Sequence, residues 1–178
     1  MDTRENRTNT SNLTNEEVAE AARLLAKLEP GFLPFPVFLE VCRLTTISTI
    51  ELVVVRRTPD GRVETWLRRR APDDVLWPGK WCNPGGVIRP TDTLETAFAR
   101  LITDDLNGAP IKGQPVFVKY LVNRTVRGQT GSPVYWVELD GEPAEGSFFP
   151  ADELPDDAIP DQRILIEIAV PHYRAHQT

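Results

Sequence analysis

Three aspartates and one arginine stand at regular spacing between residues 84 and 108 and form the most informative pattern in the sequence. Asp92 precedes Arg100, and Asp104 with Asp105 follow that arginine about one helical turn later. Carboxylates on adjacent and i+4 positions of a helix can converge on one divalent cation. Mg²⁺ usually takes one or two protein carboxylates together with substrate phosphates. The pattern therefore predicts a site for Mg²⁺ or Mn²⁺ with Asp104 and Asp105 as its carboxylate ligands. We expect Gly85-Gly86 just before it to form a tight turn that brings the backbone close to the ion.

A helix over residues 93–106 must position these side chains. Its core-facing stripe has helical spacing and consists of Leu94, Ala97, Phe98, Leu101, Ile102 and Leu106. Asp92 and Glu95 fit a capping box at the start, and Asn107-Gly108 fit a left-handed cap at the end. Sequence signals therefore bound the helix at both ends.

Asp105 falls close to the middle of the apolar stripe, and a carboxylate there must be paired, hydrogen-bonded or metal-bound. Asp104 lies at the edge of the stripe, where Arg100 can pair with it at i+4. Two alternatives stay open. Both aspartates can fray into solvent at the helix end, at a small cost from the macrodipole, and Arg100 can form an ordinary surface ion pair.

The elements around this helix predict an α/β (α+β) sandwich. Residues 50–57 form a β-branched run typical of a buried strand, and a Thr-Pro-Asp-Gly turn leads into a returning strand at 62–69. Two further strands are expected at 115–123 and 133–139, and a second helix at 161–170. Strands around amphipathic helices indicate a layered single domain.

The N-terminal part of the chain has a different character. Residues 1–14 are polar and are expected to be a disordered tail. Residues 15–46 are expected to form a helical extension, with a helix from Glu16 to Lys27 capped by Asn15 and an apolar arm broken by prolines. The main domain is then 47–178.

Composition excludes several functions. The net charge of −6 argues against a nucleic-acid-binding surface. No apolar run is long enough to span a membrane. Two cysteines, Cys42 and Cys82, make no disulfide framework, which favours a cytoplasmic protein. We expect a small-molecule partner and no nucleic acid or membrane partner.

The acidic segment resembles the Nudix box. That box has Gly, five residues, Glu, seven residues, and then Arg-Glu-apolar-x-Glu-Glu-x-Gly. The matching positions here are Gly86, Asp92, Arg100, Asp104 and Asp105, with Asp in place of Glu. Leu101 stands where the box has the Glu after the arginine, and Asn107 stands where it ends in Gly. The sequences WPGKWCNPGG and FFPADELPDD also look like the flanks of the family. The resemblance covers about residues 47–170 and implies a Nudix-type α/β/α sandwich with a mixed sheet.

Within this family the helix is similar to that of the GDP-mannose mannosyl hydrolases, which also lack that Glu and attack the sugar carbon. This resemblance implies that Asp105, with the Gly86 carbonyl, binds the metal and that Arg70 lies near the diphosphate. The branch has a Gln-His pair before its closing strand, where this chain has Glu142 and Glu145. We therefore predict that any general base comes from these two glutamates, the alternative being that both are solvated loop residues.

Trp81, with Trp77, is a candidate for stacking on a nucleobase, and core packing is the competing interpretation. The arginines at 68–70 end a strand, and one of them is expected to meet a phosphate.

Three functions follow from these features. The first is a Mg²⁺-dependent (or Mn²⁺-dependent) hydrolase of a nucleoside diphosphate linked to another moiety, such as a nucleotide sugar. The second is a generic nucleotide pyrophosphohydrolase. The third is a weak or inactive Nudix-fold module that binds a nucleotide or a protein.

Each Glu-to-Asp change withdraws a carboxylate by about 1 Å, a displacement that can cost roughly a hundredfold in rate. A homodimer is also expected.

Overall fold

The computed structural model describes residues 12–177. In this part of the chain the helices are α1 (Asn15–Leu25), α2 (Phe35–Leu44), α3 (Leu94–Asp105) and α4 (Pro160–His176). The strands are β1 (Ile47–Arg57), β2 (Val63–Arg69), β3 (Trp81–Cys82), β4 (Gly85–Val87), β5 (Ile111–Thr125), β6 (Gly128–Leu139) and β7 (Ser147–Pro150).

Strand β1 occupies the centre of a mixed sheet with the order β3-β2-β1-β6-β5. It pairs in parallel with β6 and antiparallel with β2 and β4. The β-branched run at its middle is fully buried, as expected for a strand that is covered on both faces. β1 is therefore the central strand, and the positions of the other strands and of the site are described relative to it.

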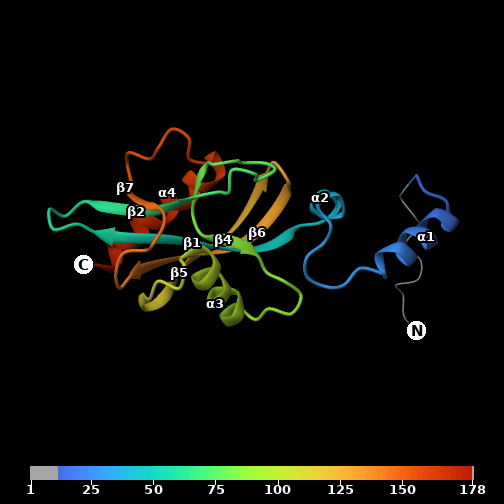
Figure 1. The fold of residues 1–178 in the computed structure, drawn as a ribbon, viewed down its shortest axis with the longest axis horizontal. Coiled ribbons are helices and arrows are strands. Elements are labelled where there is room, and N and C mark those ends of the chain that lie inside the picture. The colour runs from blue at the N-terminus through green and yellow to red at the C-terminus, as the bar shows by residue number, and fades with distance from the viewer. Residues whose placement is uncertain (1–11, 178) are drawn as a thin grey trace.

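Alternate residues of β1 belong to two different cores. Val53 and Val55 pack in a cluster with residues of α4, whereas Leu52 and Val54 pack in a cluster with Leu106, which follows α3. Successive side chains of a strand point to opposite faces, so the two helices cover opposite faces of the sheet (Figure 1). The predicted α/β/α sandwich with a mixed sheet is confirmed.

Several element boundaries differ from those predicted. β5 and β6 form a hairpin much longer than the two short strands expected, and α4 runs past Pro171 to His176. The capping box of α3 consists of Thr93 and Thr96, so the prediction of Asp92 and Glu95 was wrong. The left-handed cap is confirmed, because Asn107 and Gly108 have positive φ and the Gly108 N–H donates to the Ile102 carbonyl at 2.8 Å.

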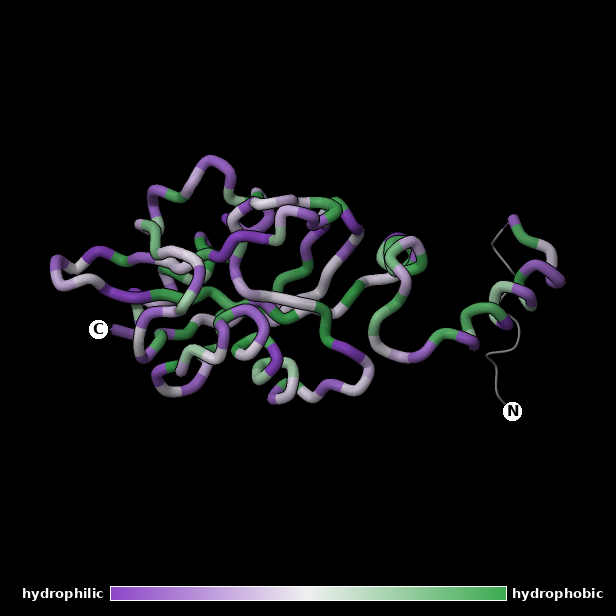
Figure 2. The backbone as a smooth tube through the Cα atoms, viewed as in Figure 1, coloured by the Kyte–Doolittle hydropathy of each residue, from purple (hydrophilic) through white to green (hydrophobic). Residues whose placement is uncertain are grey.

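The N-terminal extension lies to one side of the sandwich (Figure 1). α1 is capped by Thr14 through a capping box with Glu17, so the prediction of Asn15 as the cap was wrong. α1 has no buried residue and alternates apolar and polar positions along its length (Figure 2). α2 is attached to the sandwich through β6. Most of the predicted tail, residues 1–11, falls outside the described residues, and the division at 14 and 46 stays a prediction.

The described residues contain no helix that is long and apolar enough to cross a membrane. Cys42 and Cys82 are both free and buried.

Candidate functional site

A cavity of about 240 Å³ opens at the end of the sheet where β1 meets β4, and we call it the site cavity. Its walls come from β1, the segment 82–87, the β5–β6 hairpin and the first turn of α4. The lining residues whose side chains could bind a ligand or take part in a reaction are Glu51, Arg70, Trp77, Arg127, Asp161 and Gln162. Gly86, whose carbonyl is a predicted metal ligand, also lines this cavity.

Gly85, which lines this cavity, contacts Asp105, the last residue of α3, although Asp105 itself is not among the described residues that line it. Two donors hold the Asp105 carboxylate. Arg68 Nη1 donates to its Oδ1 at 2.5 Å, and the Gly85 N–H donates to its Oδ2 at 3.0 Å. Its side chain is only 16% exposed. The sequence-based argument that Asp105 must be paired, hydrogen-bonded or metal-bound is therefore confirmed. Its partner Arg68 is one of the three strand-end arginines that were predicted only as candidates for a phosphate contact.

Glu51 is the functional candidate that sequence reasoning missed. Its carboxylate accepts a hydrogen bond from Thr49 Oγ1 at 3.1 Å, and the nearby Gln162 side chain acts to lower its pKa. The only signal in the sequence was one acidic residue inside the apolar run 50–55. Because β1 is the central strand of the sheet, a carboxylate on it is costly to bury unless it has hydrogen-bond, ionic or metal partners.

Gly85 brings the two carboxylates into one place. It pairs with Glu51 across the β1–β4 ladder, and a Cβ atom on it would overlap with Glu51 Oε2. The same residue donates its N–H to Asp105. Gly85 and Gly86 form strand β4, so the prediction of a tight turn was wrong. The missing side chain at 85 makes room for the Glu51 carboxylate.

A polar network supports Glu51 from behind. Thr49 Oγ1 lies 2.5 Å from Ser132 Oγ, and both residues are buried. On the other side, Gln162 accepts from the Asn83 N–H at 3.1 Å through its Oε1. These contacts tie β1, β6, the segment before β4 and α4 together around one carboxylate, and so fix its position.

The two carboxylates have pKa values displaced upward. Burial raises the pKa of Glu51 to about 7, against the opposing hydrogen bond from Thr49 and the charge of Arg127. Burial also raises the pKa of Asp105, although Arg68 and the Gly85 N–H act in the other direction. The charge of Asp105 itself contributes to the raised pKa of Glu51. At both carboxyl groups burial therefore disfavours the charged form.

The remaining residues of the acidic pattern lie elsewhere. Arg100 pairs with Asp92 at 2.5 Å and donates to the Val87 carbonyl at 3.0 Å, so the predicted Arg100–Asp104 pair was wrong. The Arg89 N–H and Arg100 hold the pKa of Asp92 below its ordinary value. Asp104 is exposed to solvent, which is the alternative that the sequence left open for the helix end. Its backbone carbonyl accepts a hydrogen bond from Arg68 at 3.3 Å. Asp92 and Arg100 therefore brace the segment before α3.

Leu101 explains why the helix itself lacks a third carboxylate. It is 2% exposed and packs with Ile50 and Ala97. A carboxylate in that apolar cluster would be costly. Glu51, the neighbour of Ile50 on β1, supplies a carboxylate from the strand instead of the helix.

Arg70 and Trp77 line the site cavity. Asp74 holds the Arg70 guanidinium at 2.5 and 2.8 Å, which orients it. Trp81 is not among the described residues that line this cavity. It packs edge-on against Phe149 at 5.0 Å between ring centroids, and Arg69 stacks over it. This is the core-packing alternative, so Trp77 is the indole available to a ligand.

The two predicted loop bases are exposed and are not among the described residues that line the site cavity. Glu142 pairs with Arg56, near the far end of β1 from Glu51. Arg56 lies five positions along the strand from Glu51, which is about 16 Å at roughly 3.3 Å per residue. The structure therefore does not bring Glu142 to the carboxylate pair.

The three-layer sandwich, with an acidic pair where its central strand meets the segment before α3, belongs to a known class of fold. The sequence matches no protein-family model and no curated protein. Among solved structures, the chain is similar to a mutT/nudix family protein from Listeria innocua, with TM-score 0.58 and 18% identity over 74% of this chain and 97% of that one. The chain has the Nudix hydrolase fold.

Two further structures have the same fold. The NUDIX domain of Shewanella oneidensis NrtR complexed with ADP ribose gives TM-score 0.54 and 19% identity over 88% of this chain and 98% of that one. The Ap4A hydrolase of C. elegans gives TM-score 0.53 and 15% identity over 75% of this chain and 100% of that one. NrtR has also been solved with a 27mer DNA.

Proposed function

We propose that this protein is a divalent-metal-dependent hydrolase of a nucleoside diphosphate linked to a second moiety. The observation that carries the proposal is the convergence of Glu51 and Asp105 on Gly85 beside a cavity that also presents Arg70. It is supported by the similarity to the NrtR domain complexed with ADP ribose and to the C. elegans Ap4A hydrolase. Both compounds contain phosphate groups between two moieties.

The donor set fits Mg²⁺ or Mn²⁺. Within residues 12–177 no group of three or more Asp, Glu, His or Cys side chains could hold a metal by itself. Mg²⁺ does not need such a group, because it uses one or two carboxylates and fills its other positions from phosphates and water. We propose that Glu51, Asp105 and the Gly86 carbonyl bind the metal. Glu51 thus replaces Asp104, which the sequence analysis predicted as the second carboxylate ligand. The metal would neutralise diphosphate charge as a Lewis acid.

The protein's own residues would orient the substrate. Arg70, fixed by Asp74, presents a cation to the diphosphate from the cavity wall. Trp77 offers a flat surface to a base or sugar. Whether the bond broken lies at the sugar carbon, as in the mannosyl hydrolases, or at phosphorus is decided by the products. A cytoplasmic location and a homodimer stay predictions.

The test is a panel of nucleotide sugars, ADP-ribose and dinucleoside polyphosphates with Mg²⁺ or Mn²⁺, with free sugar and phosphate resolved. Glu51→Gln and Asp105→Asn should each lower kcat at least about a hundredfold. Asp104→Asn is the matched control, because its side chain is exposed beside Asp105, and it should keep turnover within about threefold. An equal loss of turnover in Asp104→Asn would instead assign the metal site to Asp104 and Asp105 at the end of α3. Nucleotide binding without turnover would favour the binding-module alternative.

A further inference from the structure

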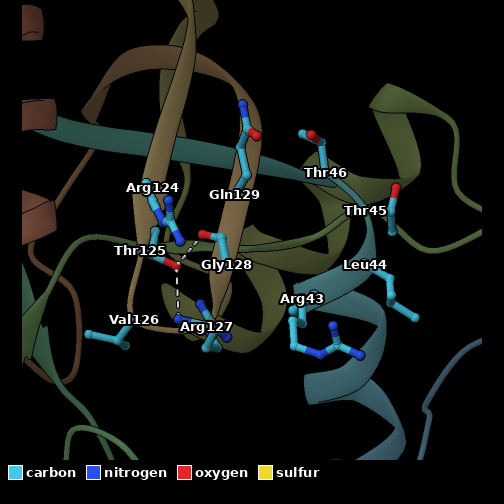
Figure 3. Close-up of a pocket in the computed structure, with 11 residues that line it drawn as sticks. Arg43, Leu44, Thr45, Thr46, Arg124, Thr125, Val126, Arg127, Gly128 and Gln129 are labelled. Atoms are coloured by element: carbon cyan, nitrogen blue, oxygen red, sulfur yellow. Dashed lines mark hydrogen bonds between the residues drawn. The ribbon is translucent and has the colours of Figure 1, made fainter. Parts of the chain in front are cut away.

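A second and larger cavity, of about 710 Å³, lies between the end of α2 and the turn of the β5–β6 hairpin. We call it the basic cavity. Three arginines line it, Arg43, Arg124 and Arg127, and none of the described residues in its wall is acidic. Figure 3 shows Arg124 and Arg127 on the hairpin and Arg43 on α2, across the opening. In a chain with a net charge of −6, such a local excess of positive charge needs a partner.

Two of these arginines have charge available for a ligand. Arg43 pairs with Glu40 on its own helix. Among the described residues, no carboxylate lies within ion-pair distance of Arg124 or Arg127. The side chains around them are polar and neutral, and include Thr45, Thr46 and Gln129. Guanidinium groups beside hydroxyl and amide donors are suited to phosphate oxygens.

The carboxyl end of α2 also faces this cavity and would repel an anion, since a helix end carries roughly half a negative charge. Two unpaired guanidinium groups outweigh that partial charge. The turn that carries Arg127 is held in place, because Thr125 Oγ1 accepts from the Arg127 N–H at 3.3 Å and donates to the Gly128 carbonyl at 3.1 Å (Figure 3).

The basic cavity adjoins the site cavity. Thr125, Val126 and Arg127 line both, so only the hairpin turn separates them. The charge of Arg127 also acts on Glu51 in the site cavity and on Cys42 at the end of α2. A ligand that lies along the turn can therefore reach both cavities.

We propose that the basic cavity binds a distal phosphate of a nucleoside polyphosphate whose hydrolysed diphosphate lies beside Glu51 and Asp105. The identity of the substrate rests on the proposed function, whereas the anion site rests on the arginines alone. The N-terminal extension then contributes to substrate choice, because α2 forms one wall of the subsite. Substrates with a longer phosphate chain are preferred over those with only a diphosphate.

Calorimetry tests the anion site without turnover. Inorganic tripolyphosphate is titrated into the full chain in the presence of a chelator. The Arg124→Gln/Arg127→Gln double variant should bind at least about tenfold more weakly than the wild type. Arg62→Gln, at an exposed arginine in the β1–β2 turn, should bind unchanged. No binding by the wild type, or an equal loss in Arg62→Gln, would overturn the subsite, as would equal affinity for inorganic phosphate. Near-UV circular dichroism verifies that the variants fold.

Kinetics separates the subsite from the proposed function. Arg124 lines only the basic cavity, so Arg124→Gln should raise the KM for diadenosine tetraphosphate at least about fivefold and leave the KM for ADP-ribose unchanged. Equal rises for both substrates would contradict the inference while leaving hydrolysis established. If the wild type turns over neither substrate, the proposed function fails, and the calorimetry still decides whether the arginines form an anion site.

Discussion

Glu51 is the residue whose ionisation should matter most to the folded protein. Its raised pKa of about 7 compares with an ordinary value of 4.5. Below pH 4.5 the carboxyl is protonated in both the folded and the unfolded chain, and its full stabilising contribution is present. Between pH 4.5 and 7 the unfolded chain releases the proton first, so the free energy of unfolding falls as pH rises. Asp105, with a raised pKa, acts in the same direction.

We predict that the free energy of unfolding falls by about 3 kcal/mol between pH 4.5 and 7 in metal-free buffer. Urea unfolding at a series of pH values measures it. Glu51→Gln should flatten most of the slope, because the amide does not titrate. A slope of the same size in Glu51→Gln would mean that other groups cause it.

Arg68 competes with any cation for Asp105, since it occupies Oδ1 of that carboxylate. Arg68→Gln should therefore bind Mn²⁺ more tightly, by about threefold to tenfold, because a competing positive charge has been removed. Calorimetry with Mn²⁺ alone measures this affinity. Arg69→Gln is the control, because Arg69 pairs with Asp157 and should leave the affinity unchanged. Weaker binding in Arg68→Gln would instead make the arginine a positioning residue for Asp105.

At the scale of elements, the sequence predicted what local periodicity determines. The stripe around Leu101 defined α3, and the β-branched run defined β1, because burial on one or two faces leaves a direct imprint on residue order. Asp105 was placed correctly for the same reason. Cap residues were wrong at both α1 and α3 by one position, which periodicity does not resolve.

Glu51 and Arg68 could not be found in this way. Both depend on strands that are distant in the sequence: Glu51 matters because β4 pairs with β1, and Arg68 because β2 lies next to the end of α3. A sequence motif records the spacing within one segment, whereas this site is completed by tertiary pairing. The motif thus contains one of the two carboxylates of the proposed site, Asp105, and the pairing of β1 with β4 adds the other.

The contact between α2 and the hairpin gives a prediction at this scale. Gly128 has φ +144°, and a Cβ on it would overlap with the Cys42 carbonyl. Gly128→Ala should lower the free energy of unfolding by at least about 3 kcal/mol, combining backbone strain with displacement of α2. Gly113→Ala is the matched control, since its φ is also positive but nothing lies within 4 Å, and it should cost about 1 kcal/mol. Chemical denaturation compares them, and equal costs would show that α2 accommodates the side chain.

At the scale of the whole molecule, the two helices of the extension should differ in importance. α1 has no buried residue, whereas α2 buries Cys42 against the hairpin. Deletion of residues 1–28 should leave Tm within about 2 °C of the full chain. Deletion through residue 44 should lower it by more than about 5 °C. Differential scanning calorimetry measures both, and equal Tm values would place α2 outside the cooperative unit.

The parallel pairing of β1 with β6 also affects how the chain is made. β1 spans residues 47–57, but its parallel neighbour starts only at Gly128. On the ribosome, the β1–β2 hairpin is therefore complete while the other edge of β1 still lacks its partner. That edge includes the most apolar run of the sequence, Leu52–Val55, and unpaired edges of this kind invite association between chains. Long-range closure also slows folding. The central place of β1 gives the finished protein its two cores, and it makes the nascent chain dependent on protection until the long hairpin has emerged.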